Sequence, residues 1–338
     1  MKICYSLSYP LFMDKGGGVT HCRELVRVLE SHGFKVTPLD WYSETVDFQV
    51  LILFGFTHFN PEVLRYLKSR DVRIITVPIF DRTRSLLSYR ILSSVFKNLP
   101  VQNLIKTKYE VLKLSDIVVA SSKVEKEEIV SIFGIDKNKV MISYLGLPSD
   151  IFQLDKRISE EMFYKEFGLR DFVFYPSAGI SRRKNQISLI KALEGTGIKV
   201  VLTGCDNVEK RIEDEFLEVV RSNKDVVCLP RLSREMLISA YKNSKVLAFV
   251  SLAETAGIVA IEGGYFGNNL VLSRLRVFQE YYGNFALYVK SKSCGDIRKK
   301  VIKAMEMERS YSMRSYILEN LTWERYAKPI IDWIHREV

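Results

Sequence analysis

The chain has 338 residues, of which 47% are hydrophobic and 27% charged, so it is long enough for two globular domains and too apolar to be disordered. Its formal net charge of +10 is spread over both halves, with 20 basic and 16 acidic residues in 1–150 and 30 and 24 in the remainder. This favours anionic partners such as phosphates, whereas the lack of a recognised nucleic-acid module argues against nucleic-acid binding.

The cysteine pattern and the length of the apolar runs indicate the cellular compartment of the protein. Five cysteines are scattered without a CxxC pair, which is typical of a reduced compartment rather than of a disulfide scaffold. No segment reaches the roughly 20 apolar residues of a membrane span. The sequence therefore predicts a cytoplasmic protein.

In the first half, apolar runs alternate with segments of helical periodicity. The predicted helices follow the strands closely, and the run at 48–54 is apolar throughout, which indicates a strand buried on both faces. This alternation is typical of a doubly wound parallel α/β domain. The predicted strands are 2–7, 34–39, 48–54, 72–77, 117–121 and 140–147, and the predicted helices are 19–33, 61–70 and 123–133.

The second half repeats this architecture after a predicted linker at 148–156. A final helix, capped by Thr322, carries a strip of large apolar residues. We therefore expect domains at 1–150 and 151–321, with 322–338 as a closing helix. The predicted strands are 171–176, 198–204, 226–229, 246–250, 270–273 and 286–289, and the main predicted helices are 157–169, 187–193 and 256–266.

Residues 82–113 form a basic segment with one acidic residue, Glu110. Leu87, Ile91 and Val95 recur in it at helical spacing. One interpretation is a core helix with a solvated basic face. The other is a helix that contacts an anionic membrane surface.

The stretch 246–273 predicts a strand, a polar loop, a helix and a second strand. Glu254 and Glu262 lie at its loop and helix, where ligands of parallel sheets bind. The backbone N–H groups of Thr255, Ala256 and Gly257 would face an anion at the positive end of the helix dipole. This combination suits a sugar nucleotide; the alternative is a pair of solvated surface carboxylates.

Other candidates also follow predicted strands. A glycine loop, which includes Gly17 and Gly18, separates the first strand from its helix. Arg182, Arg183 and Lys184 follow a turn at Gly179 and would aim cations at a diphosphate, unless they are a solvated charge run. His58 follows a strand and either faces the ligand or is an ordinary loop residue. The four histidines show no metal-ligand spacing.

These motifs together resemble those of the family-4 retaining glycosyltransferases of the GT-B fold. ETAGIVAIE is similar to the family's E-x7-E motif, with its glutamates at Glu254 and Glu262. The family's diphosphate loop is similar to AGISRRKNQISLIKAL, and its first glycine loop is similar to GGGVTHCRELVRVLESHGFKV. The family's last helix is similar to LTWERYAKP. The resemblance implies two Rossmann-like doubly wound domains facing each other across a cleft, with the last helix crossing back to the first domain.

The resemblance also implies roles for individual residues. Lys184 and either Arg182 or Arg183 would bind the donor diphosphate after Gly179, and Glu254 would contact the donor sugar. Glu262 would accept from the ribose hydroxyls, and Leu232 would lie near the base. Gly17, Gly18 and the N–H groups of Thr255, Ala256 and Gly257 would complete the phosphate site.

The sequence departs from the family pattern on the acceptor side. Pro78 stands near the position of a common family histidine, so Asp81 and His58 are the acceptor-side candidates. Ala256 replaces the usual aromatic residue of the motif.

The implied activity is transfer of a sugar from a UDP- or GDP-sugar to a glycan, lipid-linked or other hydroxyl acceptor, with retention of configuration. No DxD motif is present, and the cations and N–H groups would stabilise the leaving diphosphate without an obligatory metal or other cofactor. The protein would be cytoplasmic or peripheral at the inner face of the membrane. The alternatives are a GT-B-type sugar-nucleotide epimerase and a basic nucleic-acid-binding protein.

Overall fold

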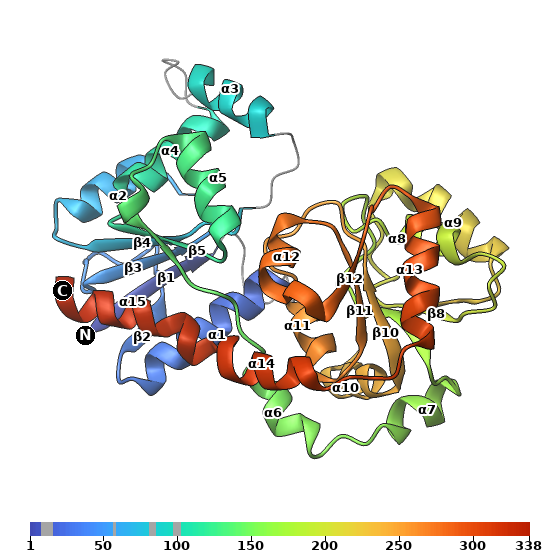
Figure 1. Cartoon of the computed structure of the whole chain (residues 1–338). Helices are drawn as coiled ribbons and strands as arrows, with labels where there is room; N and C mark the ends of the chain where they lie inside the picture. Colours follow the sequence, from blue (N-terminus) through green and yellow to red (C-terminus); the bar gives the residue numbers. More distant parts are fainter. Residues whose placement is uncertain (8–15, 57–58, 81–85, 97–102) are drawn as a thin grey trace. The chain divides into compact units, whose positions relative to one another are not determined.

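The computed structural model describes residues 1–7, 16–56, 59–80, 86–96 and 103–338, and it divides the chain into two compact units (Figure 1). Unit 1 contains Met1–Leu145 and Trp323–Val338, and unit 2 contains Gly146–Thr322. Each unit has a parallel six-stranded sheet with flanking helices, so the prediction of two Rossmann-like doubly wound units is confirmed. The first boundary lies five residues before the predicted one.

Unit 1 has the strand order β2-β1-β3-β4-β5-β6. Ser122 caps α5 by accepting from the Glu125 N–H group, and Gly134 ends it in a left-handed conformation. These two residues explain why α5 has the predicted bounds. The strands are β1 (Lys2–Leu7), β2 (Lys35–Pro38), β3 (Val50–Phe54), β4 (Arg73–Val77), β5 (Ile117–Ala120) and β6 (Val140–Ile142); the helices are α1 (Gly17–Ser31), α2 (Pro61–Lys68), α3 (Leu86–Phe96), α4 (Leu104–Leu114), α5 (Lys123–Phe133) and α15 (Trp323–Glu337).

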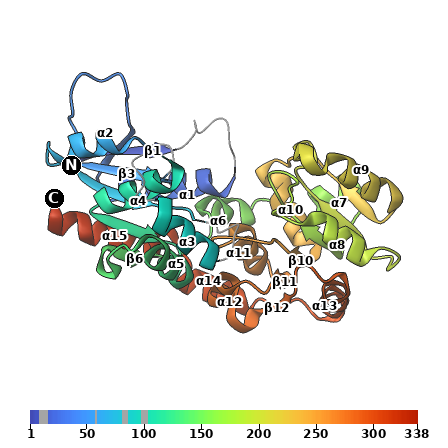
Figure 2. The ribbon, with the colours of Figure 1, turned by 90° about the horizontal axis from the view of Figure 1, so that it is seen from above.

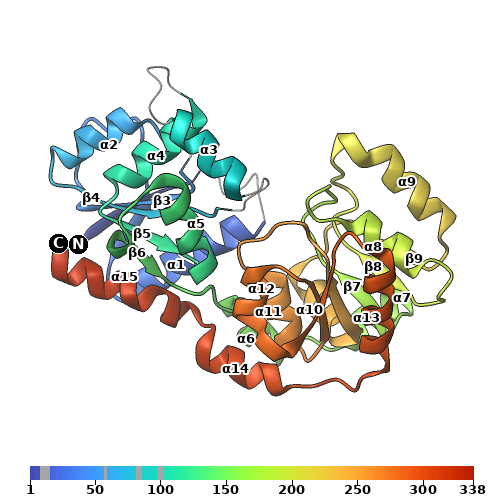
Figure 3. The ribbon, with the colours of Figure 1, turned by 45° about the horizontal axis from the view of Figure 1, so that its top comes forward.

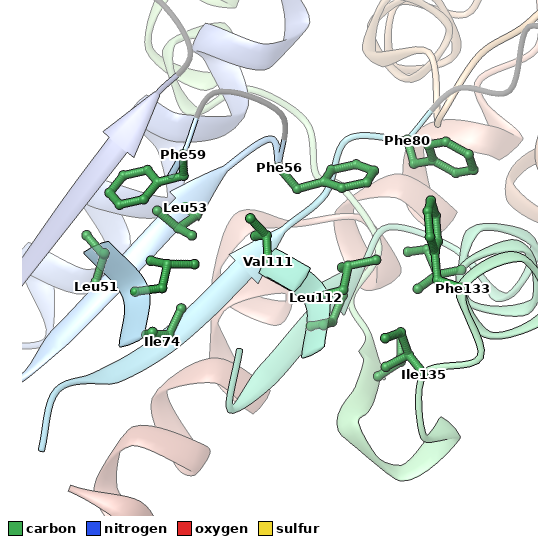
Figure 4. Close-up of a cluster of buried hydrophobic side chains, with 14 of the residues drawn as sticks. Leu51, Leu53, Phe56, Phe59, Ile74, Phe80, Val111, Leu112, Phe133 and Ile135 are labelled. Carbon is green, nitrogen blue, oxygen red and sulfur yellow. The ribbon is translucent and has the colours of Figure 1, made fainter. Parts of the chain in front are cut away.

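The sheet of unit 1 is buried on both faces. Leu51 and Leu53 of β3 point into a core that α4 and α5 close with Val111, Leu112 and Phe133 (Figure 4). The alternate residues of β3, Ile52 and Phe54, are also buried. All five residues of β3 are therefore out of water, as its continuous apolar run predicts.

Helix α15 packs against α1, so residues more than 290 positions apart in the sequence share one core (Figure 1). The His21 ring of α1 lies 5.4 Å from the Trp323 ring and 4.8 Å from the Tyr326 ring, centroid to centroid. Arg27 also donates to Glu324 at 3.0 Å. The last helix is thus part of unit 1, as predicted.

The basic segment 82–113 contains two helices, α3 and α4. Helix α4 packs inward through Val111 and Leu112. On α3, in contrast, Leu87, Ile91 and Val95 are 66%, 56% and 53% exposed. The core-helix interpretation is therefore wrong for these three residues, because periodicity shows that a helix has an apolar face but not what covers it.

Unit 2 has the strand order β12-β11-β10-β7-β8-β9. Helices α8 and α13 lie side by side on one face of its sheet (Figure 3), and α9 lies beside α8 (Figure 2). The strands are β7 (Phe172–Tyr175), β8 (Val200–Leu202), β9 (Val226–Cys228), β10 (Ser244–Phe249), β11 (Asn269–Ser273) and β12 (Ala286–Val289); the helices are α6 (Ser149–Asp155), α7 (Glu161–Phe167), α8 (Gln186–Leu193), α9 (Glu213–Ser222), α10 (Arg234–Asn243), α11 (Ile258–Tyr265), α12 (Arg276–Tyr282), α13 (Cys294–Glu306) and α14 (Ser312–Asn320).

The predicted linker at 148–156 is a helix in the structure. Helix α6 follows Pro148, carries Asp150 in its first turn and buries Ile151 completely. A buried anchor residue and an acidic first turn both favour helix in a short segment. The residues that follow the unit boundary thus form a helix of unit 2.

Candidate functional site

The order of the second sheet places a topological switch point between β7 and β10. The chain adds β8 and β9 on one side of β7, then returns to build β10, β11 and β12 on the other side. In open α/β sheets ligands bind at the carboxyl ends of the two strands that flank such a point. The loops after β7 and β10 carry the Arg-Arg-Lys run and Glu254, so two sequence candidates meet there.

Glu254 holds two cations from the loop after β7. Its Oε1 atom lies 2.6 Å from Lys184 Nζ and 3.1 Å from Arg183 Nη1. The Glu254 side chain is only 8% exposed, whereas the Lys184 and Arg183 side chains are 19% and 37% exposed, so the carboxylate is buried and the two cations reach solvent. Lys184 Nζ also lies 4.5 Å from the centre of the Phe249 ring. Among the described residues, this cluster pairs two cations with one carboxylate.

The two loops are joined through their backbones as well. The Leu252 N–H group donates to the Arg183 carbonyl at 2.8 Å. The Tyr175 hydroxyl, at the end of β7, donates to the Lys184 carbonyl and lies 3.1 Å from Ser251 Oγ. Burial raises the pKa of Tyr175 well above its usual value, so this hydroxyl stays protonated. Lys184 is thus fixed at both its backbone and its side chain.

Helix α11 starts at the same place. Gly257 precedes it with φ +74°, and a Cβ atom there would lie 2.9 Å from the Phe278 ring, so glycine suits this turn. The Tyr282 hydroxyl donates to the carbonyls of Ala256 and Gly257. Within the described part of the chain, no oxygen accepts from the N–H groups of Thr255, Ala256 or Gly257. The positive end of α11 can therefore receive an anion.

Glu262 is one turn further along α11 and has different partners from Glu254. Its Oε1 accepts from Arg234 Nη1 at 2.8 Å, and its Oε2 accepts from the Tyr241 hydroxyl at 2.6 Å. Its side chain is 5% exposed. The interpretation of the two glutamates as solvated surface carboxylates is therefore wrong.

The structure separates the two arginines of the run. Arg183 reaches Glu254, whereas Arg182 is exposed and its backbone N–H donates to Glu209 at 3.0 Å. Gly179 lies on the same loop, where a Cβ atom would be 2.7 Å from the Asn207 carbonyl oxygen. Leu232 is half-buried in the loop after β9, two residues before Arg234.

The candidates from the first half belong to unit 1. Gly17 and Gly18 form the start of α1, directly after Gly16. His58 and Asp81 lie outside the described residues. The structure therefore brings Arg183, Lys184 and Glu254 together in the loops after β7 and β10, and it leaves the acceptor-side candidates as predictions.

Arg234 and Tyr241 are missing from the sequence prediction. One local signal was available, because Arg234 occupies the first position of α10, where a cation opposes the helix dipole. Such a residue is expected to have an acidic partner nearby. The identity of that partner depends on the tertiary fold, since Glu262 lies 28 residues away.

Comparison with known proteins finds similarity to glycosyltransferases. The family model described as Glycosyl transferases group 1 matches residues 159–321. An uncharacterized glycosyltransferase of Methanocaldococcus jannaschii is 26% identical over 230 residues, which are 65% of this chain and 58% of the relative. A D-inositol 3-phosphate glycosyltransferase of Mycolicibacterium smegmatis is 23% identical over 169 residues, which are 48% of this chain and 38% of that relative. The chain thus spans less than two thirds of either relative.

Solved structures of similar fold cover the whole chain. Sucrose-phosphate synthase from Thermosynechococcus elongatus superposes with a TM-score of 0.78 at 13% identity, covering 99% of this chain and 98% of that one. The Anabaena protein HepE in complex with UDP-glucose superposes with a TM-score of 0.69 at 14% identity, covering 99% and 100%. At these identities the likeness establishes the fold.

Proposed function

We propose that this chain, whose residues 159–321 match the family model described as Glycosyl transferases group 1, moves a sugar from a nucleoside diphosphate donor to a hydroxyl acceptor with retention of configuration. The observation that carries the proposal is the pairing of Lys184 and Arg183 with Glu254 at the switch point of the unit 2 sheet. A site with two cations, one carboxylate and a helix N-terminus matches a diphosphate joined to a polyhydroxylated sugar.

In this proposal the donor diphosphate takes over the two cations. Glu254 pairs with Lys184 and Arg183 and offsets one of their two positive charges, and a diphosphate at the start of α11 would compete with it for both cations. The released carboxylate could then accept a hydrogen bond from a sugar hydroxyl. Arg183, which reaches Glu254, takes the diphosphate role in preference to Arg182.

The reaction breaks the bond between the sugar and the diphosphate, and negative charge grows on the departing phosphate oxygen. Lys184, Arg183 and the N–H groups at the start of α11 stabilise that charge most in the transition state. Together they supply the positive charge that a divalent metal supplies in other transferases. We therefore propose a reaction without an obligatory metal or other cofactor.

A thermal-shift screen of UDP-, GDP- and ADP-sugars, with the free nucleosides as controls, tests donor binding. A ligand present at 100 times its dissociation constant stabilises the protein by about 2.7 kcal/mol, so the true donor should raise the melting temperature clearly. The nucleosides should raise it much less, because they lack the diphosphate. Equal shifts for a nucleoside and its diphosphate sugar would contradict the diphosphate site.

We further propose that α3 contacts an anionic membrane surface on the acceptor side. Leu87, Ile91 and Val95 give it an exposed apolar strip, and Arg90 is exposed beside them. A hollow of about 460 Å³ between α3 and α5 is lined by the first two of these residues and by Arg90. Apolar and cationic groups on one short helix suit the interface of an anionic bilayer. None of the described helices has the length and apolarity needed to cross a bilayer.

Vesicle flotation provides the test of this contact. The protein is expected to float with vesicles that contain an anionic lipid and to float less with neutral ones. Ile91→Asp should reduce flotation severalfold, because it places a carboxylate in the apolar strip. Leu217→Asp is the matched control, since Leu217 is also exposed but lies on α9 of unit 2. Equal flotation of Ile91→Asp and the wild type would show that α3 does not contact the membrane.

A further inference from the structure

Arg234 joins two carboxylates from different parts of unit 2. Its Nη1 donates to Glu262 at 2.8 Å, while its Nε and Nη2 donate to the two oxygens of Asp150 at 2.8 and 2.9 Å. The Asp150 contact is thus bidentate, which fixes the plane of the guanidinium group. Asp150 belongs to α6, so the first helix after the unit boundary orients Arg234.

Glu262 is in turn held at both oxygens. Arg234 donates to Oε1, and the buried Tyr241 hydroxyl donates to Oε2. A carboxylate offers about four lone-pair positions, so two positions remain after these bonds. The side chain cannot rotate without breaking at least one of the two bonds, and therefore its remaining lone pairs have fixed directions.

We propose that Arg234 is a positioning residue for recognition of the donor ribose, because it holds Glu262 in the orientation that accepts the ribose hydroxyls. The inference rests on the proposed function and adds a residue that sets the preference for ribonucleotides over deoxyribonucleotides. Without Arg234, the Glu262 carboxylate keeps one donor, Tyr241, and is free to turn. It then loses the fixed geometry that a vicinal diol requires.

The experiment compares binding of UDP and GDP with that of 2′-deoxy-UDP and 2′-deoxy-GDP by titration calorimetry. For the nucleotide that binds, the wild type is expected to prefer the ribose form about tenfold or more, the range of one charge-assisted hydrogen bond. Arg234→Met should reduce that preference to nearly one, mainly by weakening the ribonucleotide. A purely structural Arg234 would lower stability and leave the preference unchanged.

A matched control is available in the same unit. Arg314 donates to Asp155 at 2.9 Å and to the Tyr265 hydroxyl at 2.8 Å. Arg314→Met therefore removes a similar set of arginine hydrogen bonds, none of which involves Glu262. This variant should keep the wild-type preference. If Arg234→Met does not fold, Asp150→Asn replaces it, since Arg234 then loses its bidentate partner and the preference should still fall.

The outcomes separate the two proposals. A wild type that binds none of the nucleoside diphosphates contradicts the proposed function itself. The role of Arg234 alone is overturned if the wild type prefers ribonucleotides and the folded Arg234→Met variant, or its substitute Asp150→Asn, keeps the same preference. A wild type that binds ribo and deoxy forms equally also overturns it, because Glu262 then does not read the ribose.

Discussion

Replacing Lys184 by alanine is expected to lower the turnover number about 10² to 10³-fold, the effect of losing one preorganised donor to a developing anion, about 2.7–4 kcal/mol. The Nζ atom is held 2.6 Å from Glu254 and against the Phe249 ring, so the cation is in place before the donor binds. Its attraction to the diphosphate grows as the glycosidic bond breaks. The loss should therefore appear in turnover as well as in the donor Michaelis constant.

The measurement is release of nucleoside diphosphate as a function of donor concentration, with circular dichroism to verify folding. Lys191→Ala is the control, because Lys191 forms a comparable 2.6 Å pair with Glu215 on the exposed side of α8. That variant should behave like the wild type, as expected of an exposed ion pair. Wild-type kinetics in Lys184→Ala would show that the diphosphate binds elsewhere.

Unit 1 is expected to lose stability as the pH falls below about 6.5, through His21. This ring is buried between α1 and α15, and no described residue bonds its Nε2 atom. Burial lowers the pKa of His21 to about 3, whereas an unfolded histidine has a pKa of about 6.5. Because the unfolded chain binds a proton at this ring below pH 6.5 and the folded chain does so only near pH 3, the free energy of unfolding falls between these pH values by about 1.4 kcal/mol per pH unit. At pH 5 the expected loss is about 2 kcal/mol.

Urea unfolding followed by tryptophan fluorescence at pH 7.5 and pH 5 measures this effect. All three tryptophans of the chain, Trp41, Trp323 and Trp333, belong to unit 1, so the signal reports on that unit. In His21→Leu the titrating group is gone, and the difference between the two pH values should shrink by about 2 kcal/mol. The same pH dependence in both proteins would mean that His21 contributes nothing to it.

Local signals explain how much of the fold could be predicted. Helix α5 has the predicted bounds because Ser122 and Gly134 mark its ends, and β10 was recognisable as an apolar run before a polar loop. The alternation of such segments is enough to predict two parallel sheets. In contrast, the apolar spacing of α3 carried no information about its neighbours, so its exposure had to come from the structure.

The candidate site was predictable in part for the same reason. Lys184 and Glu254 lie in the loops that follow β7 and β10, and strand ends of a parallel sheet meet at one edge, so their proximity follows from the topology. The pairing of Arg234 with Asp150 connects residues 84 positions apart through the packing of α6 and α10, which no local pattern encodes. Sequence therefore indicated Glu254, its partner Lys184 and Glu262, but not the residues that orient Glu262.

A product assay tests the central claim most directly. The donor found in the screen is labelled in its sugar and incubated with the protein and a panel of hydroxyl acceptors, which includes sugar phosphates and a lipid extract. The account predicts that with one acceptor the label leaves the nucleotide, appears in a second product and releases one nucleoside diphosphate for each sugar moved. Label that stays on the nucleotide with every acceptor, whether unchanged or as an epimer, would contradict a glycosyltransferase.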